Sequence, residues 1–312
     1  MSPTPHGHRG AGRGRPLRRA AVASAVLLAA TAGTTVYVKA QAHDAAALVS
    51  RVSTGSTAST PTPERSPVDQ DAKLAEAVRA VAAGHEGAVS VAVLDVAGGT
   101  SAAYTPGDGT TYDTASIVKV DVLAALLLKA QDDGRTPTAQ EKAYAAAMIE
   151  RSDNDATTAL WKTIGGADGL DAANERLGLT ATAGGDGPLW GLTQTTAADQ
   201  LVLLRQVFGV GGSALSAASR AYVQELMGNV EADQAWGVSA AASSGTAAEL
   251  KNGWLRRSTT ELWVINSVGR VSVAGKRYLV AVVSNGSTTK DDGISLVEDV
   301  AKAAVKAVGD GG

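Results

Sequence analysis

The sequence predicts an α/β fold in which an antiparallel sheet, built from both ends of the folded part, lies beside an all-helical subdomain. Three observations lead to this prediction. A β-branched apolar run at residues 88–96 lies near the start of the folded part, strand-like runs at 261–267 and 277–284 lie near its end, and the chain between them has helical periodicity. Strands from the two ends must therefore pair across the helices.

The composition limits the class of protein. The 312 residues carry a net charge of −3 and include no cysteine. The near-neutral balance gives no electrostatic reason to expect a nucleic-acid partner. The lack of cysteine excludes disulfides, cysteine zinc sites and thiol catalysis. Because the sequence shows no cluster of His, Asp and Glu, we expect no metal and no cofactor.

The first 42 residues have the pattern of an export segment. Residues 1–19 contain five arginines and no acidic residue, and residues 20–38 are uncharged. The apolar run is a signal peptide that ends near position 42, or an uncleaved membrane anchor, and the sequence leaves both open. Either way the rest of the chain is expected to be exported, secreted or anchored in the cytoplasmic membrane with the folded domain outside. Only this N-terminal segment would contact the membrane.

The folded domain is expected over residues 69–312. Residues 43–68 precede it as an extended linker, because Ser, Thr and Pro dominate from about position 50. The domain begins with helical periodicity at residues 69–83, followed by the buried strand at 88–96. A Gly-Gly turn then leads into a second short strand at 101–104.

The middle of the domain is expected to be helical and its end to return to strands. Helices are expected at residues 116–130, 138–151, 195–208 and 216–227. The strands at 261–267 and 277–284 follow, and an amphipathic helix at 294–308 ends the domain.

The richest local signal is the hexapeptide TASIVK at residues 114–119, which opens the first of these helices. Thr114 is the expected N-cap, with Asp113 as the alternative. Ser116 would then lie in the first turn, where free backbone N–H groups favour a developing oxyanion. Lys119 would lie on the same face. A lysine in an apolar site loses proton affinity, so its neutral amine can take the proton of a neighbouring serine hydroxyl.

Ser-x-x-Lys alone is a weak signal, because residues 287–290 (STTK) repeat it in a polar turn. Two further motifs strengthen it: Ser-Asp-Asn at 152–154 and Lys-Asn-Gly at 251–253. Singly, each is also typical of a helix end or a turn. In this order the three motifs resemble the signature of class A β-lactamases and related penicillin-binding serine hydrolases, Ser-x-x-Lys, Ser-Asp-Asn and Lys-Thr-Gly. The similarity covers about residues 69–308.

This resemblance implies a β-lactamase/transpeptidase-like fold and a reaction through an acyl-serine. Ser116 would attack a carbonyl, Lys119 would be the candidate base, and Ser152 would relay a proton to the leaving nitrogen. Backbone N–H groups of Ser116 and Trp254 would form the oxyanion hole. The implied partner is a small-molecule β-lactam or a peptidoglycan stem peptide, bound by a monomer. The residues expected to bind it are Asn154, Lys251, Asn252, Gly253 and Trp254.

The sequence departs from the family pattern where deacylation takes place. Class A β-lactamases use a glutamate on the loop that follows the Ser-Asp-Asn helices, but residues 178–196 contain no glutamate, and Asp186 is their only acid. Asp186 is either a deacylation base or a plain turn residue. Asn252 stands where Thr or Ser is usual. A basic residue often assists the position of Lys251, and the unranked candidates for it are Arg256, Arg257 and Arg270.

Two functions therefore remain open. The first is an enzyme that hydrolyses the amide of a β-lactam or D-alanyl peptide, with slow turnover because the glutamate is missing. The second is a penicillin-binding or cell-wall-recognising module that turns over no substrate, and a D,D-peptidase lies between the two. A Ser-His-Asp triad would have to use His85, which lies in a loop with no serine signature.

Overall fold

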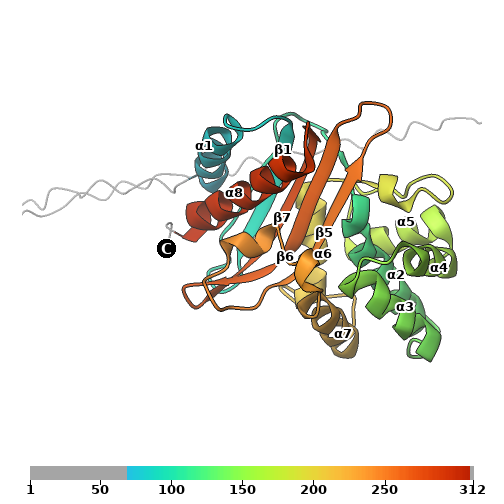
Figure 1. Cartoon of the computed structure of the whole chain (residues 1–312). Coiled ribbons are helices and arrows are strands. Elements are labelled where there is room, and N and C mark those ends of the chain that lie inside the picture. Colours follow the sequence, from blue (N-terminus) through green and yellow to red (C-terminus); the bar gives the residue numbers. More distant parts are fainter. Residues whose placement is uncertain (1–68, 310–312) are drawn as a thin grey trace, which may run out of the picture. The chain divides into compact units, whose positions relative to one another are not determined.

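The computed structural model describes residues 69–309 of the chain (Figure 1). The expected export segment at residues 1–42 and the linker at 43–68 lie outside the described residues. Within residues 69–309, no helix combines the length and the apolar character needed to cross a membrane.

A five-stranded antiparallel sheet lies at the centre of the fold, with the order β2-β1-β7-β6-β5. The central pairing joins β1 to β7, with Val91 opposite Val282, so the two ends of the domain meet in one sheet. This confirms the predicted fold class and the pairing of strands from both ends. The strands are β1 (Ala88–Asp95), β2 (Ser101–Tyr104), β5 (Glu249–Arg256), β6 (Trp263–Val273) and β7 (Lys276–Ser287).

Alternate side chains of the central strands pack into two separate cores. On β7, Val280 packs with α1 (Gln70–Ala82) and α8 (Lys290–Gly309), whereas Ala281 packs with the helical subdomain. Figure 1 shows α1 and α8 together on one side of the sheet. A strand covered on both faces is apolar at nearly every position, which explains the continuous apolar runs in the sequence.

The helical subdomain is built around α2 (Val118–Asp132). Every residue of α2 from Val118 to Leu128 is buried, and the helix contacts α3, α4, α5 and α7. A helix with no polar face must be surrounded by other elements, so α2 is the central helix of this subdomain. The other helices are α3 (Ala139–Glu150), α4 (Asn154–Ile164), α5 (Gly166–Leu177), α6 (Ala197–Phe208) and α7 (Ala217–Gly228).

A small second sheet holds the loop at 178–193 against the start of α2. It pairs β3 (Tyr112–Asp113) with β4 (Gln194–Thr195). Next to it, the backbone N–H of Thr114 donates to the carbonyl oxygen of Thr193 at 2.8 Å. The loop is therefore placed beside Ser116 by backbone hydrogen bonds.

Two elements differ from the sequence expectations. The Lys-Asn-Gly segment at 251–253 lies inside strand β5, not ahead of the C-terminal strands. Lys, Asn and Gly favour strands weakly, so tertiary pairing with β6 overrides local propensity here. Helix α5 was not expected, because its glycine-rich start weakens the helical pattern.

Candidate active site

Ser116 lies in a single 3-10 turn, Ala115–Ile117, that leads directly into α2. The residue before it, Ala115, has φ +47°, a left-handed conformation that is unfavourable for alanine. Strain of this kind persists only where the surroundings enforce it, and it is common at functional sites. The serine is thus presented on a tight, constrained turn.

Thr114 occupies the expected N-cap position of this turn, but its side chain makes no capping hydrogen bond. The carboxylate of Asp113 accepts from Gln194 and pairs with Arg257 instead of capping the helix. The backbone holds the turn in place, because Asn266 Nδ2 on β6 donates to the carbonyl oxygens of Asp113 at 2.9 Å and Thr114 at 2.8 Å. A distant strand therefore fixes the entry into α2.

Lys119 is the centre of the hydrogen-bond network. Its side chain is fully buried, and Nζ lies 2.8 Å from Ser116 Oγ. Nζ also lies 2.8 Å from Ser152 O, 2.9 Å from Ser152 Oγ and 3.0 Å from Asn154 Oδ1. An ammonium has only three N–H bonds for these four oxygens, whereas a neutral amine can also accept from a hydroxyl. The arrangement therefore suits a lysine that takes the Ser116 proton.

The electrostatics of Lys119 favour its neutral form. Burial and, to a smaller extent, the nearby charge of Lys251 lower the pKa of Lys119 to about 6, against the opposing effect of Asp153. Near neutral pH most of the population therefore carries an unprotonated amine that can act as a base.

The Ser-Asp-Asn segment joins α3 to α4. Ser152 has φ +56°, and in this conformation both its carbonyl oxygen and its Oγ lie against Lys119. Asp153 caps α4, because its Oδ1 accepts from the N–H of Ala156 at 2.7 Å. On its other side, Ser152 Oγ lies 3.1 Å from Lys251 Nζ. Ser152 thus connects two buried amines.

Strand β5 supplies the other wall of the site. Lys251 is fully buried, and burial lowers its pKa to about 7. Asn252 is also fully buried, and its Nδ2 donates to the carbonyl oxygen of Gln234. Its Oδ1 has no hydrogen-bond partner, and the residue does not line the cavity in front of Ser116. The side chain of Asn252 therefore anchors the segment around Gln234, and it does not face the cavity in front of Ser116.

Gly253 lies directly against the 3-10 turn Ala115–Ile117, which we call the nucleophile turn because it contains Ser116, the expected nucleophile. A Cβ at this position would come within 2.6 Å of Ser116 N and 2.9 Å of Ile117 N. Only glycine allows β5 to approach the start of α2 this closely. The backbone of the next residue, Trp254, is therefore held beside the N–H of Ser116, as an oxyanion hole requires.

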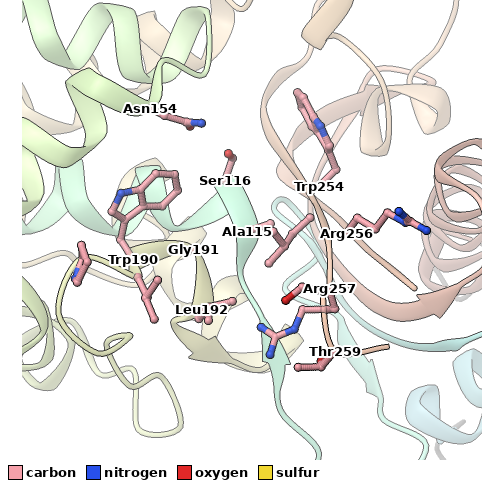
Figure 2. Close-up of a pocket in the computed structure, with 14 residues that line it drawn as sticks. Ala115, Ser116, Asn154, Trp190, Gly191, Leu192, Trp254, Arg256, Arg257 and Thr259 are labelled. Carbon is pink, nitrogen blue, oxygen red and sulfur yellow. The ribbon is translucent and has the colours of Figure 1, made fainter. Parts of the chain in front are cut away.

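An open cavity of about 540 Å³ lies in front of Ser116. In Figure 2, Asn154 and Trp190 lie on one side of Ser116 and Trp254 lies on the other. The structure thus brings Ser116, Lys119, Ser152, Asn154 and Lys251 together, with Gly253 and Trp254 beside them. The cavity is lined by Ala115, Ser116, Asn154, Pro188, Leu189, Trp190, Gly191, Leu192, Trp254, Leu255, Arg256, Arg257, Ser258 and Thr259.

A family model described as "Beta-lactamase enzyme family" matches residues 128–308, more than half of the chain. The chain belongs to the beta-lactamase enzyme family. This membership confirms the resemblance seen in the sequence motifs and indicates a serine hydrolase. No curated protein matches the chain.

Solved structures of beta-lactamases and of a penicillin-binding protein share the fold. The TLA-1 extended-spectrum beta-lactamase has a TM-score of 0.67 and 16% identity, covering 77% of this chain and 99% of its own. A PBP-A mutant in an acyl-enzyme complex with penicillin G has a TM-score of 0.63 and 21% identity, covering 77% and 97%. A beta-lactamase from Streptosporangium roseum has a TM-score of 0.63 and 22% identity, covering 76% and 99%.

The loop at 178–196 distinguishes this beta-lactamase family member from the class A pattern. Asp186, its only acid, is exposed and does not line the cavity. The loop instead presents apolar side chains to the cavity, among them Leu189 and Trp190. None of the described residues that line the cavity is Asp or Glu.

Trp190 is a site residue that the sequence did not indicate. Its ring centroid lies 5.1 Å from Lys119 Nζ, within the range of a cation–π contact. Its Nε1 donates to Thr158 Oγ1 on α4 at 3.2 Å. The sequence signal that could have found Trp190 is a tryptophan in the glycine-rich loop on which class A β-lactamases carry their glutamate. Asn266, which holds the nucleophile turn, lies in an ordinary apolar strand and gave no signal.

The three arginines proposed to assist Lys251 all have acidic partners. Arg256 pairs with Glu261 at 2.6 Å, and Arg257 pairs with Asp113 at 2.8 Å. Arg270 forms an ion pair with Glu249. Arg256 and Arg257 line the cavity, so these two are placed to meet a substrate.

The histidine that a Ser-His-Asp triad would need lies away from the cavity in front of Ser116. His85 is largely buried, and its Nδ1 lies 3.1 Å from Asp292 Oδ1 at the start of α8. It is not among the residues that line the cavity. Between residues 69 and 309, no group of three or more His, Asp or Glu side chains has the arrangement of a metal site.

Proposed function

We propose that this protein is a penicillin-binding serine hydrolase that is acylated on Ser116 by the amide of a β-lactam or a D-alanyl peptide and releases the acyl group slowly. The observation that carries the proposal is the contact of Lys119 Nζ with Ser116 Oγ at 2.8 Å, made by a lysine whose pKa is lowered to about 6. A neutral amine in hydrogen-bond reach of a serine hydroxyl is the arrangement that activates the nucleophile.

In the proposed acylation, Ser116 Oγ attacks the amide carbon as its proton passes to Lys119 Nζ. The new O–C bond forms, and the C–N bond breaks. Ser152 Oγ, which lies within 2.9 Å of Lys119 Nζ, passes a proton from the lysine to the leaving nitrogen. The products are an ester on Ser116 and a free amine, and Lys119 is neutral again.

The walls of the cavity suit the charges of this reaction. Backbone N–H groups of Ser116 and Trp254 would bind the oxyanion that develops on the carbonyl oxygen. Lys251 is buried and does not line the cavity, so it would act on a substrate carboxylate through its positive potential, and its pKa of about 7 would rise in the presence of that negative charge. Arg256 and Arg257 line the cavity, each paired with a carboxylate.

We expect slow release of the acyl group from Ser116 because the loop at 178–196 brings no carboxylate to the cavity. Hydrolysis of the ester needs a base that takes a proton from water, and no Asp or Glu occurs among the described residues around the cavity. The same feature supports the second candidate function, a penicillin-binding or D,D-peptidase-like module with little β-lactamase turnover. Residues 1–42 support the further proposal that the protein acts outside the cytoplasmic membrane, secreted or anchored there. We also propose that it is a monomer.

A labelling experiment tests the proposed function. A fluorescent penicillin is expected to label the purified protein covalently at Ser116, as detected on a denaturing gel and by peptide mass spectrometry. Ser116→Ala is expected to abolish the label, because among the described residues that line the cavity only Ser116 has a hydroxyl in hydrogen-bond contact with Lys119. A chromogenic cephalosporin is expected to be hydrolysed slowly. An unlabelled wild type, or equal label in Ser116→Ala, would contradict the proposal, and rapid cephalosporin hydrolysis would contradict slow release.

Gly253→Ala is expected to lower the rate of labelling by about a hundredfold. The added Cβ would lie 2.6 Å from Ser116 N, so β5 must move away from the nucleophile turn and the oxyanion hole must widen. The measurement is the second-order rate constant for fluorescent-penicillin labelling. Gly107→Ala is the matched control, because this exposed glycine does not have a left-handed backbone and its Cβ would meet only Thr110 Oγ1 at an ordinary 3.5 Å. An unchanged labelling rate in Gly253→Ala would show that the close approach has no role in the reaction.

A further inference from the structure

We propose that Trp190 shields Lys119 from water and thereby prolongs the life of the acyl-enzyme, an inference that rests on the proposed acylation of Ser116. The ring of Trp190 faces Lys119 Nζ at 5.1 Å and forms part of the cavity wall. On its other sides Nζ is surrounded by Ser116, Ser152 and Asn154. The ring therefore covers the side of the amine that faces the cavity.

Trp190 is held in this position from two directions. Its Nε1 donates to Thr158 Oγ1, and that hydroxyl itself donates to the carbonyl oxygen of Asn154. On the other side, the turn that contains Trp190 and Gly191 contacts the turn that contains Ser116. The ring is therefore tied to α4 by a hydrogen bond, and the backbone that carries it packs beside Ser116.

The shield acts at the deacylation step. Water that attacks the ester on Ser116 must give up a proton as its oxygen bonds to the carbonyl carbon, and the C–Oγ bond then breaks. The described groups near Ser116 that can receive this proton are Lys119 Nζ and Ser152 Oγ, since no carboxylate lines the cavity. A water molecule that reaches Nζ from the cavity needs the space that the Trp190 ring occupies. The ring therefore keeps the base and the water apart.

The same ring favours acylation. In that step Lys119 becomes an ammonium for a short time, and the face of an indole stabilises a cation at this distance. Loss of the ring should therefore change the two half-reactions in opposite directions: slower acylation and faster deacylation. A residue that only supported the fold would slow both, so the opposite signs identify the shield.

The test compares Trp190→Ala with Trp190→Phe and Tyr144→Ala. Tyr144 is an aromatic residue of α3 that is 36% exposed and does not line the cavity, so its truncation is the matched control. Purified full-length protein is labelled with fluorescent penicillin and chased with unlabelled penicillin, and the loss of label is followed on gels. Only folded protein becomes labelled, so misfolding lowers the amount of label without changing its lifetime.

In Trp190→Ala the label is expected to disappear about tenfold faster than in wild type, while the rate of labelling falls by about threefold. Trp190→Phe keeps an aromatic face and is expected to stay close to wild type, and Tyr144→Ala is expected to leave both rates unchanged. An unchanged label lifetime in Trp190→Ala, or an equally short lifetime in Tyr144→Ala, would overturn the shield.

A second readout does not depend on acylation of Ser116. Acetic anhydride at pH 10 modifies accessible neutral amines, and mass spectrometry gives the rate at Lys119 relative to exposed Lys129 on the same helix. Trp190→Ala is expected to raise this ratio about tenfold. An unchanged ratio would overturn the shield. If wild type takes no penicillin label while the ratio still rises, the proposed function fails and the shielding of Lys119 stands.

Discussion

Lys119→Met is expected to lower the rate constant for acylation of Ser116 by about a thousandfold, the range that a general base supplies. Methionine fills the buried space of the lysine but offers no lone pair of comparable basicity to the Ser116 proton. The amine it replaces lies 2.8 Å from Ser116 Oγ and 2.9 Å from Ser152 Oγ. Both the activation of the nucleophile and the proton relay to the leaving nitrogen are lost together.

The pH dependence of acylation gives this prediction a second measure. Below the pKa of Lys119, about 6, the amine is protonated and cannot accept a proton, so the wild-type rate is expected to rise with pH through that value. The rise should be absent in Lys119→Met. Rates are measured with fluorescent penicillin from pH 5 to 8, with Lys129→Met on the exposed face of α2 as control. A Lys119→Met rate within about tenfold of wild type would show that another group is the base.

Asp121→Asn is expected to stabilise the protein by about 2–4 kcal/mol at pH 8. Asp121 is a fully buried residue of α2. Its Oδ1 accepts from Gln200 Nε2 at 3.2 Å, whereas Oδ2 has no partner. Burial and, to a smaller extent, the charge of Asp199 raise the pKa of Asp121 to about 7, against the opposing effect of the hydrogen bond from Gln200. At pH 8 the folded protein therefore holds a poorly compensated buried anion.

The stabilisation expected for Asp121→Asn depends on pH. Between pH 4 and 7 the folded state keeps a proton that the unfolded state has released, so the free energy of unfolding falls as the pH rises. Asparagine presents an oxygen to Gln200 without a charge, so the variant should lose this pH dependence and gain least near pH 4. The free energy of unfolding of wild type and variant is measured with urea at pH 4, 6 and 8, and a substitution of an exposed residue, Asp108→Asn, is the control. A variant less stable than wild type at pH 8 would show that the ionised carboxylate stabilises the fold.

Most of the fold could be predicted because its strands and helices carry strong local patterns. The apolar run at 88–96 became β1, and the run at 116–130 became α2, since elements buried on all sides keep apolar residues at nearly every position. Strand β5 could not be predicted, because its Lys-Asn-Gly segment has little strand propensity and is extended only through pairing with β6.

The motifs in the sequence predicted which residues form the site, but they did not predict which of their side chains point into it. The three motifs identified Ser116, Lys119, Ser152 and Lys251, which the structure places in one hydrogen-bond network. The motif alone also suggested a substrate contact for Asn252, whose buried side chain bonds to the segment around Gln234. Neighbouring residues on a strand point in opposite directions, so membership of a motif does not assign a side chain to the site.

The sequence by itself determined the family and the fold class, and it singled out Ser116 and Lys119 as the expected nucleophile and base, because short segments with residues in fixed order carry these features. Tertiary structure alone decided what surrounds them. The low pKa of Lys119 comes from burial among α2, α4 and β5. The ring of Trp190 reaches Lys119 because β3 and β4 hold its loop beside Ser116 and because Thr158 on α4 binds its Nε1. Desolvation and shielding arise from segments far apart in the chain, so no local pattern encodes them.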